Sequence, residues 1–363
     1  MTTDGRSFEQ ASATSSGAET GPGDVDVPIA PADSPEAPAP KGRRRRAVIL
    51  LFVLLLLSLL VLFTGWYLVT RKPITELPLP GIGEGNLPTY SFSLYGVTSP
   101  IGVVASADGS RIYVTESGGE RLTHVYDSKG IQIATFSPPG SAPGSRTPAY
   151  ITLDPTNGDV YVSDRVAGTI YIYDKDGAFQ RKFEPTLAVP NWQPMGLAFD
   201  AQGNLYVSDV GGPIQQVEVF GRDGTLLRTI GEKGQFLFPN GLAVDAKDHL
   251  FVSDGNNGRV LIFDVTGHQI GLIPRGVANG ELGLPRGVAL DDSNRLYVVD
   301  TTGMTVQVYA VDPTTGLPKY VGTVGAEGVG DGQFQFPNGI AVDTRARLYV
   351  ADTANNRVQV WSY

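Results

Sequence analysis

The chain has 363 residues, with 45 glycines, 26 prolines and no cysteine, and its formal net charge is −9. The absence of cysteine excludes disulfides, thiolate metal sites and a cysteine nucleophile. The acidic balance argues against a nucleic-acid partner, because Lys and Arg must replace the counterions of a phosphate backbone. The glycine and proline content is typical of a chain with many turns and short strands.

Residues 1–46 are predicted to form a disordered cytoplasmic tail with a basic end. The first forty are rich in Ala, Pro, Ser, Gly and acidic residues, and their one aromatic residue is Phe8. A segment of this composition cannot bury enough apolar surface to offset the entropy that is lost on ordering.

The uncharged run of 23 residues that follows, 47–69, predicts a transmembrane helix. A helix of that length spans the ~30 Å hydrocarbon core of a bilayer, whereas the apolar region of a cleaved signal peptide is about 7–15 residues. Five cations precede the run and two, Arg71 and Lys72, follow it. The positive-inside rule therefore predicts a single-pass cell-membrane protein whose N-terminus is cytoplasmic and whose remainder is extracytoplasmic. Residues 70–88, with four prolines and three glycines, read as a linker.

From residue 89 to residue 363 the sequence repeats itself every 45–52 residues. Each unit holds short alternating strands separated by Asp- and Gly-type turns, and four strands per unit are typical of a propeller blade. We therefore expect an all-β fold, a six-bladed β-propeller with four-stranded blades. The units are led by six prolines: Pro100, Pro148, Pro194, Pro239, Pro285 and Pro337.

The sixth unit ends at its third strand, "RVQVWSY", residues 357–363. An uncovered edge at this position would invite pairing with other chains. The segment "YSFSLYG", residues 90–96, precedes the first blade and matches the pattern of a fourth strand. We predict that this N-terminal strand pairs with the C-terminal strand and closes the last blade.

The sixth unit, "GQFQFPNGIAVDTRARLYVADTANNRVQVW", resembles an NHL repeat, and the fourth unit is nearly as close. The resemblance extends over about residues 90–363. It is strongest in blades 3 to 6, since Ser106 and Tyr150 depart from the Asp and Gly of the pattern. The whole plan is similar to that of bacterial NHL-repeat membrane proteins. The resemblance implies an external propeller that binds proteins or other ligands, although a fold alone does not fix a function.

Most of the recurrent residues are expected to be structural. Acidic residues end the second strand of every blade, where we expect them to accept hydrogen bonds from turn backbone. A glycine follows the Pro-x pair in five blades, where it would let crowded innermost strands approach closely. In the second blade Tyr150 takes its place, and its ring either reaches the channel mouth or fills a gap. The acidic set is Glu116, Asp164, Asp209, Asp254, Asp300 and Asp352.

The position between the proline and the glycine predicts a ligand site. In a propeller it lies where the chain enters the innermost strand, beside the central channel. Three consecutive blades place Asn240, Arg286 and Asn338 there, and an Arg fork suits a carboxylate or a phosphate. The alternative is that Asn favours the turn and that Arg286 pairs with a nearby acid. Met195 and Trp192 are expected on the apolar side of the same mouth.

An enzymatic alternative is a metal-dependent lactonase or esterase similar to gluconolactonase and regucalcin, in which a "PNG" Asn helps to hold a divalent metal. Asn240 and Asn338 match that Asn, but the ring offers no carboxylate and Arg286 would repel a cation. Lyase propellers of the peptidyl-hydroxyglycine type use histidines to hold zinc, and the three histidines here are not expected to converge. We therefore expect no catalytic residue, no metal and no cofactor. The favoured function is a membrane-anchored extracytoplasmic module that binds or scaffolds a protein, peptide or glycan ligand.

Overall fold

The computed structural model describes residues 51–52, 54, 57–58, 87–186 and 191–363. The chain divides into two units, Met1–Pro78 and Leu79–Tyr363. The predicted tail 1–46, most of the predicted helix 47–69 and the predicted linker 70–86 lie outside the described residues. Within the residues that are described, no helix is both long and apolar enough to cross a membrane.

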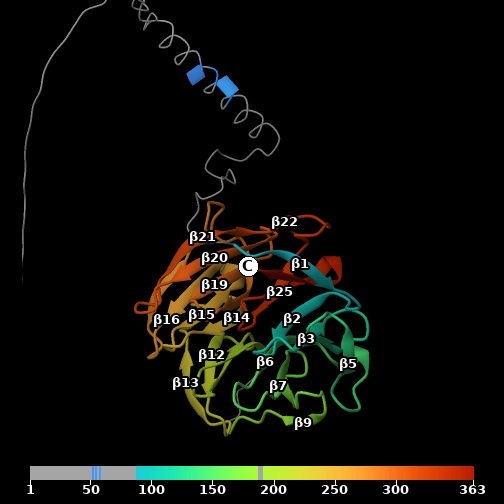
Figure 1. Cartoon of the computed structure of the whole chain (residues 1–363). Coiled ribbons are helices and arrows are strands. Elements are labelled where there is room, and N and C mark those ends of the chain that lie inside the picture. The colour runs from blue at the N-terminus through green and yellow to red at the C-terminus, as the bar shows by residue number, and fades with distance from the viewer. Residues whose placement is uncertain (1–50, 53, 55–56, 59–86, 187–190) are drawn as a thin grey trace, which may run out of the picture. The chain divides into compact units, whose positions relative to one another are not determined.

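The second unit is a propeller of six four-stranded antiparallel sheets, as the repeats predict (Figure 1). Blade 1 consists of β2 (Pro100–Ala105), β3 (Arg111–Glu116), β4 (Thr123–Asp127) and β5 (Gln132–Phe136). Blade 2 consists of β6 (Pro148–Leu153), β7 (Val160–Asp164), β8 (Thr169–Tyr173) and β9 (Phe179–Lys182). Blade 3 consists of β10 (Pro194–Phe199), β11 (Leu205–Asp209), β12 (Gln216–Phe220) and β13 (Leu226–Ile230).

The second half of the propeller repeats this plan. Blade 4 consists of β14 (Pro239–Val244), β15 (Leu250–Asp254), β16 (Arg259–Phe263) and β17 (Gln269–Ile273). Blade 5 consists of β18 (Pro285–Leu290), β19 (Arg295–Asp300), β20 (Thr305–Val311) and β21 (Pro318–Val324). Blade 6 consists of β24 (Pro337–Val342), β25 (Leu348–Asp352), β26 (Arg357–Ser362) and the N-terminal strand β1 (Thr89–Leu94).

The innermost strand of each blade packs against the innermost strands of both neighbouring blades, so the ring is closed. The strands are crowded at the conserved glycine position. A Cβ atom on Gly102 would lie 2.5 Å from the carbonyl oxygen of Ala149, and one on Gly287 would lie 2.7 Å from that of Asn338. These distances are too short for any side chain, which confirms the predicted role of the glycines.

The core lies between blades rather than within them. One cluster joins Tyr206 and Val219 of blade 3 to Leu250, Leu261 and Phe263 of blade 4, and all five are buried. Equivalent clusters occupy the spaces between the other neighbouring blades. Each blade therefore buries its apolar faces only against its neighbours, as expected for a repeat architecture.

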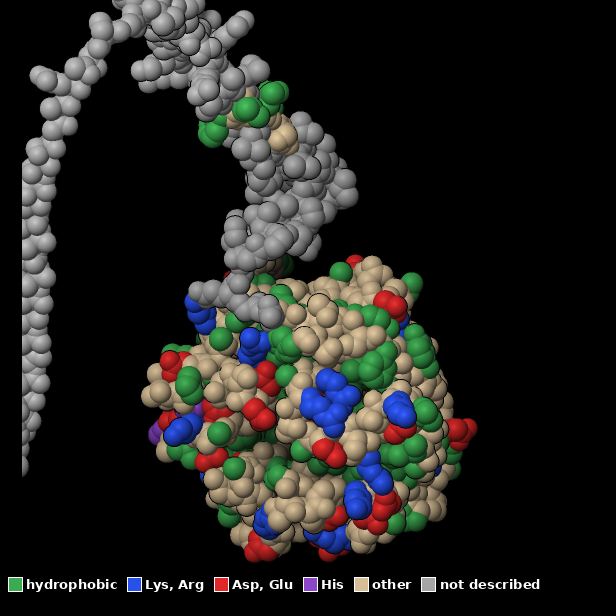
Figure 2. Space-filling view, in the orientation of Figure 1, with side chains coloured by type: hydrophobic (Ala, Val, Ile, Leu, Met, Phe, Trp, Pro, Cys, Tyr) green, Lys and Arg blue, Asp and Glu red, His purple; other side chains and the backbone are tan. Residues whose placement is uncertain are grey.

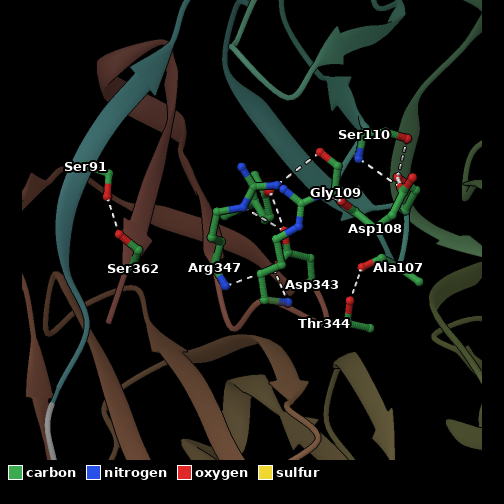
Figure 3. Close-up of polar contacts among 12 residues, drawn as sticks. Ser91, Ala107, Asp108, Gly109, Ser110, Asp343, Thr344, Arg347 and Ser362 are labelled. Atoms are coloured by element: carbon green, nitrogen blue, oxygen red, sulfur yellow. Dashed lines mark hydrogen bonds and ion pairs between the residues drawn. The ribbon is translucent and has the colours of Figure 1, made fainter.

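The predicted closure is confirmed. Strand β1 pairs antiparallel with β26, and in the resulting register Tyr90 faces Trp361 and Leu94 faces Val358. The Tyr90 and Trp361 rings meet edge-on with their centroids 6.0 Å apart. Figure 3 shows Ser91 of β1 beside Ser362 of β26, with their hydroxyl oxygens 2.6 Å apart.

A second seam joins blade 6 to blade 1 at the turns between their first and second strands (Figure 3). Asp343 accepts a hydrogen bond from Nε of Arg347 at 2.8 Å, and Nη2 of the same side chain donates to the carbonyl oxygen of Gly109 at 3.1 Å. Thr344 donates its hydroxyl to the carbonyl oxygen of Ala107 at 2.6 Å. The ring is thus closed by a backbone ladder at its outer edge and by side chains at these turns.

Candidate ligand-binding site

Acidic residues at the ends of the second strands fix the loops that lead into the channel mouth. Asp254 accepts the backbone N–H of Leu237 at 2.7 Å, just before the repeat proline of blade 4. The same carboxylate accepts Nε of Arg259 at 2.8 Å, and Arg357 pairs with Asp352 at the same distance. Backbone N–H groups at the corresponding places bond the other acids, so their predicted structural role is confirmed: Glu116, Asp164, Asp209, Asp300 and Asp352.

Asn240 and Arg286, both predicted as site residues, are in direct contact. Nη1 of Arg286 donates to Oδ1 of Asn240 at 2.8 Å. The Asn240 side chain is fully buried, and its Nδ2 has no hydrogen-bond partner among the described residues. Arg286 is partly exposed and has no carboxylate partner in the described part of the chain. The ion pair that was the alternative reading of Arg286 is therefore not formed with any residue that the structure describes.

Tyr150 brings Asn338 into the same group. Its hydroxyl donates to Oδ1 of Asn338 at 3.0 Å, although blade 1 separates the two blades that carry these residues. The Tyr150 side chain is 8% exposed, and burial raises the pKa of its phenol while the charge of Arg286 acts in the opposite direction. The ring therefore lies in the channel, where it both fills space and reaches the polar side of the mouth.

Met195 and Trp192, the two residues expected on the apolar side of the mouth, lie in different surroundings. Met195 is partly exposed at the start of β10, and its carbonyl oxygen accepts the hydroxyl of Ser163 at 2.7 Å. Trp192 packs its ring against Phe183 and Phe220, with centroids 6.2 Å apart in both cases. It is thus part of the packing between blades 2 and 3, and it also lines one cavity with Arg165 and Val166.

Trp192 also contacts a buried carboxyl group. Its Nε1 donates to Oε2 of Glu218 at 3.0 Å, and Nε2 of Gln216 donates to the other oxygen at 3.2 Å. Glu218 is 1% exposed, and burial, with a smaller effect of the nearby Asp209, raises its pKa from 4.5 to about 7. This carboxyl group therefore changes its charge near neutral pH.

Sequence reasoning missed two residues of the mouth, Phe238 and Arg165. The guanidinium carbons of Arg165 and Arg286 each lie 5.7 Å from the centroid of the Phe238 ring. Phe238 has a positive φ of 61° and donates its backbone N–H to Oε1 of Gln215. The sequence "FPNG", shared by blades 4 and 6, could have indicated Phe238, whereas nothing in the pattern indicates Arg165.

The three histidines lie in separate places. His124 is within 3.1 Å of Glu116 in blade 1, and His249 contacts Asp245 at 2.7 Å in a turn of blade 4. His268 is largely exposed beside Asp264. The described residues contain no group of three or more His, Asp and Glu side chains placed to hold a metal ion. These donors do not form a zinc site of the lyase type.

The charges of the surface are mixed. Figure 2 shows acidic and basic side chains scattered among apolar ones on the face in view. On this face the charges therefore do not form one acidic field.

The comparisons agree with the repeat and with the fold. The NHL repeat model matches residues 236–263, 282–309 and 334–361, which lie in blades 4, 5 and 6. Among solved structures, a streptogramin B lyase aligns with 76% of this chain and over 98% of its own length. The TM-score is 0.56 and the sequence identity is 16%. At this level of identity the likeness shows the fold alone. The chain thus carries NHL repeats in a six-bladed β-propeller.

The curated relatives match this chain over only part of their length. The chain is 29% identical over 154 residues to a probable peptidyl-alpha-hydroxyglycine alpha-amidating lyase of Caenorhabditis elegans, covering 38% of this chain and 44% of that protein. It is 25% identical over 218 residues to NHL repeat-containing protein 3 of Homo sapiens, and this match covers 58% of this chain and 50% of that protein. The chain therefore spans half or less of the length of these two relatives.

Proposed function

We propose that the propeller is an extracytoplasmic binding or scaffolding module for a protein ligand, anchored in the cell membrane by the helix predicted over 47–69. The ligand binds at the channel mouth, where Asn240, Arg286, Asn338 and Tyr150 come together. The observation that carries this proposal is Arg286, a partly exposed cation whose one polar partner among the described residues is a neutral amide. A charged donor left in this state is suited to an external acceptor.

The chemistry of the mouth favours binding over metal-assisted hydrolysis. A divalent cation is held by several oxygen ligands, often carboxylates. Here the amide oxygens of Asn240 and Asn338 are already used by Arg286 and by Tyr150. Arg286 also adds a positive charge at the place where a metal ion would have to sit. The lyase names of some similar proteins therefore do not carry over to this site.

Site-specific photo-crosslinking in cells that express the full chain tests the proposal. A photoreactive amino acid at Leu237, which is 49% exposed beside Phe238, should capture a protein ligand. The matched control is Ile133 on the outer strand β5, which is 51% exposed. Arg286→Ala should abolish the adduct at position 237. If adducts form equally at both positions, or persist unchanged in Arg286→Ala, the protein ligand does not bind at the mouth.

A further inference from the structure

We propose that Arg165 and Arg286 form a two-arginine anion site whose ligand is an acidic peptide segment with apolar side chains. The inference deepens the proposed function, and it rests on the channel mouth being a protein-binding surface. It names the chemical class of the segment that docks there: at least two carboxylates that face the two guanidinium groups, flanked by apolar residues.

The first step is the geometry of the two arginines. Arg165 follows the last residue of β7 in blade 2, and Arg286 is the second residue of β18 in blade 5. Both guanidinium carbons lie 5.7 Å from the centroid of Phe238, so their separation is at most twice that distance. Residues that are 121 positions apart in the sequence therefore place like charges around one aromatic ring.

The second step is that these two charges are not neutralised. No ion pair joins either arginine to a carboxylate in the described part of the chain, whereas Arg259, Arg347 and Arg357 each pair with an aspartate. A cation over an aromatic face gains only about 0.5–1 kcal/mol at an exposed site. Apart from Nη1 of Arg286, which donates to Asn240, their hydrogen-bond donors thus remain available, and an anionic ligand relieves the repulsion between neighbouring like charges.

The third step is a buried donor beside Arg286. Asn240 is fully buried, and its Nδ2 has no partner among the described residues, while its Oδ1 orients the guanidinium group. A buried donor without a partner costs free energy, which an acceptor can recover. The buried amide thus orients the guanidinium group, and the partly exposed Arg286 is the group that meets a carboxylate.

The fourth step concerns exposed apolar side chains on the loops of Arg165 and Phe238 and on the equivalent loop of blade 6. Val166 follows Arg165 and is 69% exposed, and Leu237 precedes Phe238 and is 49% exposed. Phe336, which occupies in blade 6 the position of Phe238 in blade 4, is 55% exposed. Exposed apolar side chains beside unpaired cations are typical of a protein-binding surface rather than of a site for a small free anion. The ligand is therefore a peptide that carries both acidic and apolar side chains.

Fluorescence polarisation with the full chain in detergent micelles tests this assignment. The probe is a labelled octapeptide that alternates Leu and Glu, and the matched peptide carries Gln in place of Glu. We expect the Glu peptide to bind at least tenfold more tightly, and more weakly as the salt concentration rises. Arg165→Gln and Arg286→Gln should each reduce this preference about tenfold. Arg181→Gln, the same charge change on the exposed outer strand β9, should leave it unchanged.

The outcomes separate the two proposals. If the two peptides bind equally, or if neither arginine variant alters the preference, the anion site is overturned. Crosslinking at position 237 that still depends on Arg286 would in that case leave the proposed function standing. If inorganic phosphate displaces the Glu peptide at equal concentration, the ligand of the site is a small anion and not a peptide. Loss of both crosslinking and peptide binding in the parent chain would overturn both proposals, and unchanged thermal melting of each variant serves as the folding control.

Discussion

Hydroxyl groups at or just after the ends of the second strands tie blades 1, 2, 3, 5 and 6 to the next blade. Ser163 donates to the carbonyl oxygen of Met195 at 2.7 Å, and it also accepts the backbone N–H of Tyr150 at 3.0 Å. Thr115 makes the equivalent bond from blade 1 to Ala149 at 2.5 Å. In blades 5 and 6, which have Val and Ala at this place, Thr301 and Thr353 bond the proline carbonyl of the following blade instead. At these five junctions one hydroxyl satisfies backbone groups that would otherwise be buried unpaired.

Ser163→Ala should lower the free energy of unfolding by about 1–3 kcal/mol, because it leaves both a donor and an acceptor of the backbone unsatisfied. The matched control is Ser253→Ala in blade 4, since the Ser253 hydroxyl is buried at the same place without a hydrogen-bond partner. Urea unfolding of the full chain measures both. Equal losses in the two variants would show that the hydroxyl bond does not carry the effect.

Glu218 makes the stability depend on pH. Its pKa is raised from 4.5 to about 7 in the folded chain, so the folded state holds a proton that the unfolded state releases. The stabilisation is therefore complete below pH 4.5 and is lost as the pH rises through about 7, a change on the order of 3 kcal/mol. Glu218→Gln should remove this part of the pH dependence and should leave the variant more stable than the parent at pH 8. The melting temperatures of the parent chain and of Glu218→Gln at pH 5 and pH 8 measure this effect. If the melting temperatures of both proteins change equally between the two pH values, the prediction is wrong.

At the residue scale, the sequence predicted which residues occupy equivalent positions of the repeat better than it predicted their hydrogen-bond partners. Asn240, Arg286 and Asn338 followed from their common place in the repeat. The bond between Arg286 and Asn240 depends on side-chain conformation, which no periodicity encodes. Phe238 has a positive φ, and that conformation is uncommon for a bulky residue, so the pattern did not indicate how its side chain is placed.

At the scale of elements, the strands were predictable because alternation and turn residues recur six times. The closure by β1 was predictable because the sixth unit lacked a strand and an upstream segment had the matching pattern. The short parallel pair of β22 (Ala326–Glu327) and β23 (Gln333–Phe334) was not predicted. It has two residues in each strand and lies in the loop between blades 5 and 6, and a single parallel bridge between Arg275 and Leu282 takes the same place between blades 4 and 5. Pairing over one or two residues is too short for alternation to indicate.

Replacing residues 89–94 with a Gly-Ser segment of equal length should lower the melting temperature and should cause association between chains. The replacement removes the ladder to β26 and leaves that strand as an exposed edge. The same replacement at residues 79–84, in the predicted linker, is the control. Differential scanning calorimetry and size-exclusion chromatography of the full chain measure the two effects. An unchanged melting temperature and elution volume would show that β1 does not hold the ring closed.

At the scale of the whole molecule, the proposed topology determines which ligands can reach the mouth. The prediction rests on the five cations before the run 47–69 and the two after it. A reporter that works only after export, fused after Tyr363, should be active in cells that express the full chain. A reporter that works only in the cytoplasm should be inactive at the same position. The reverse result would place the propeller in the cytoplasm and would redirect the search for its ligand.

The strand that closes the ring is also the first strand after the predicted linker. Thr89, at the start of β1, directly follows residues 70–88, and β1 is held by a single ladder at the outer edge of blade 6. In an anchored protein, tension on the linker would therefore act on β1 before it acts on any other strand. A pull strong enough to detach β1 would uncover β26 while leaving Asn240, Arg286 and Phe238 within intact sheets or beside them. The outer strand of blade 6 and the mouth thus belong to mechanically separate parts of one ring, and load on the anchor would expose the edge of β26 before it disturbed a bound ligand.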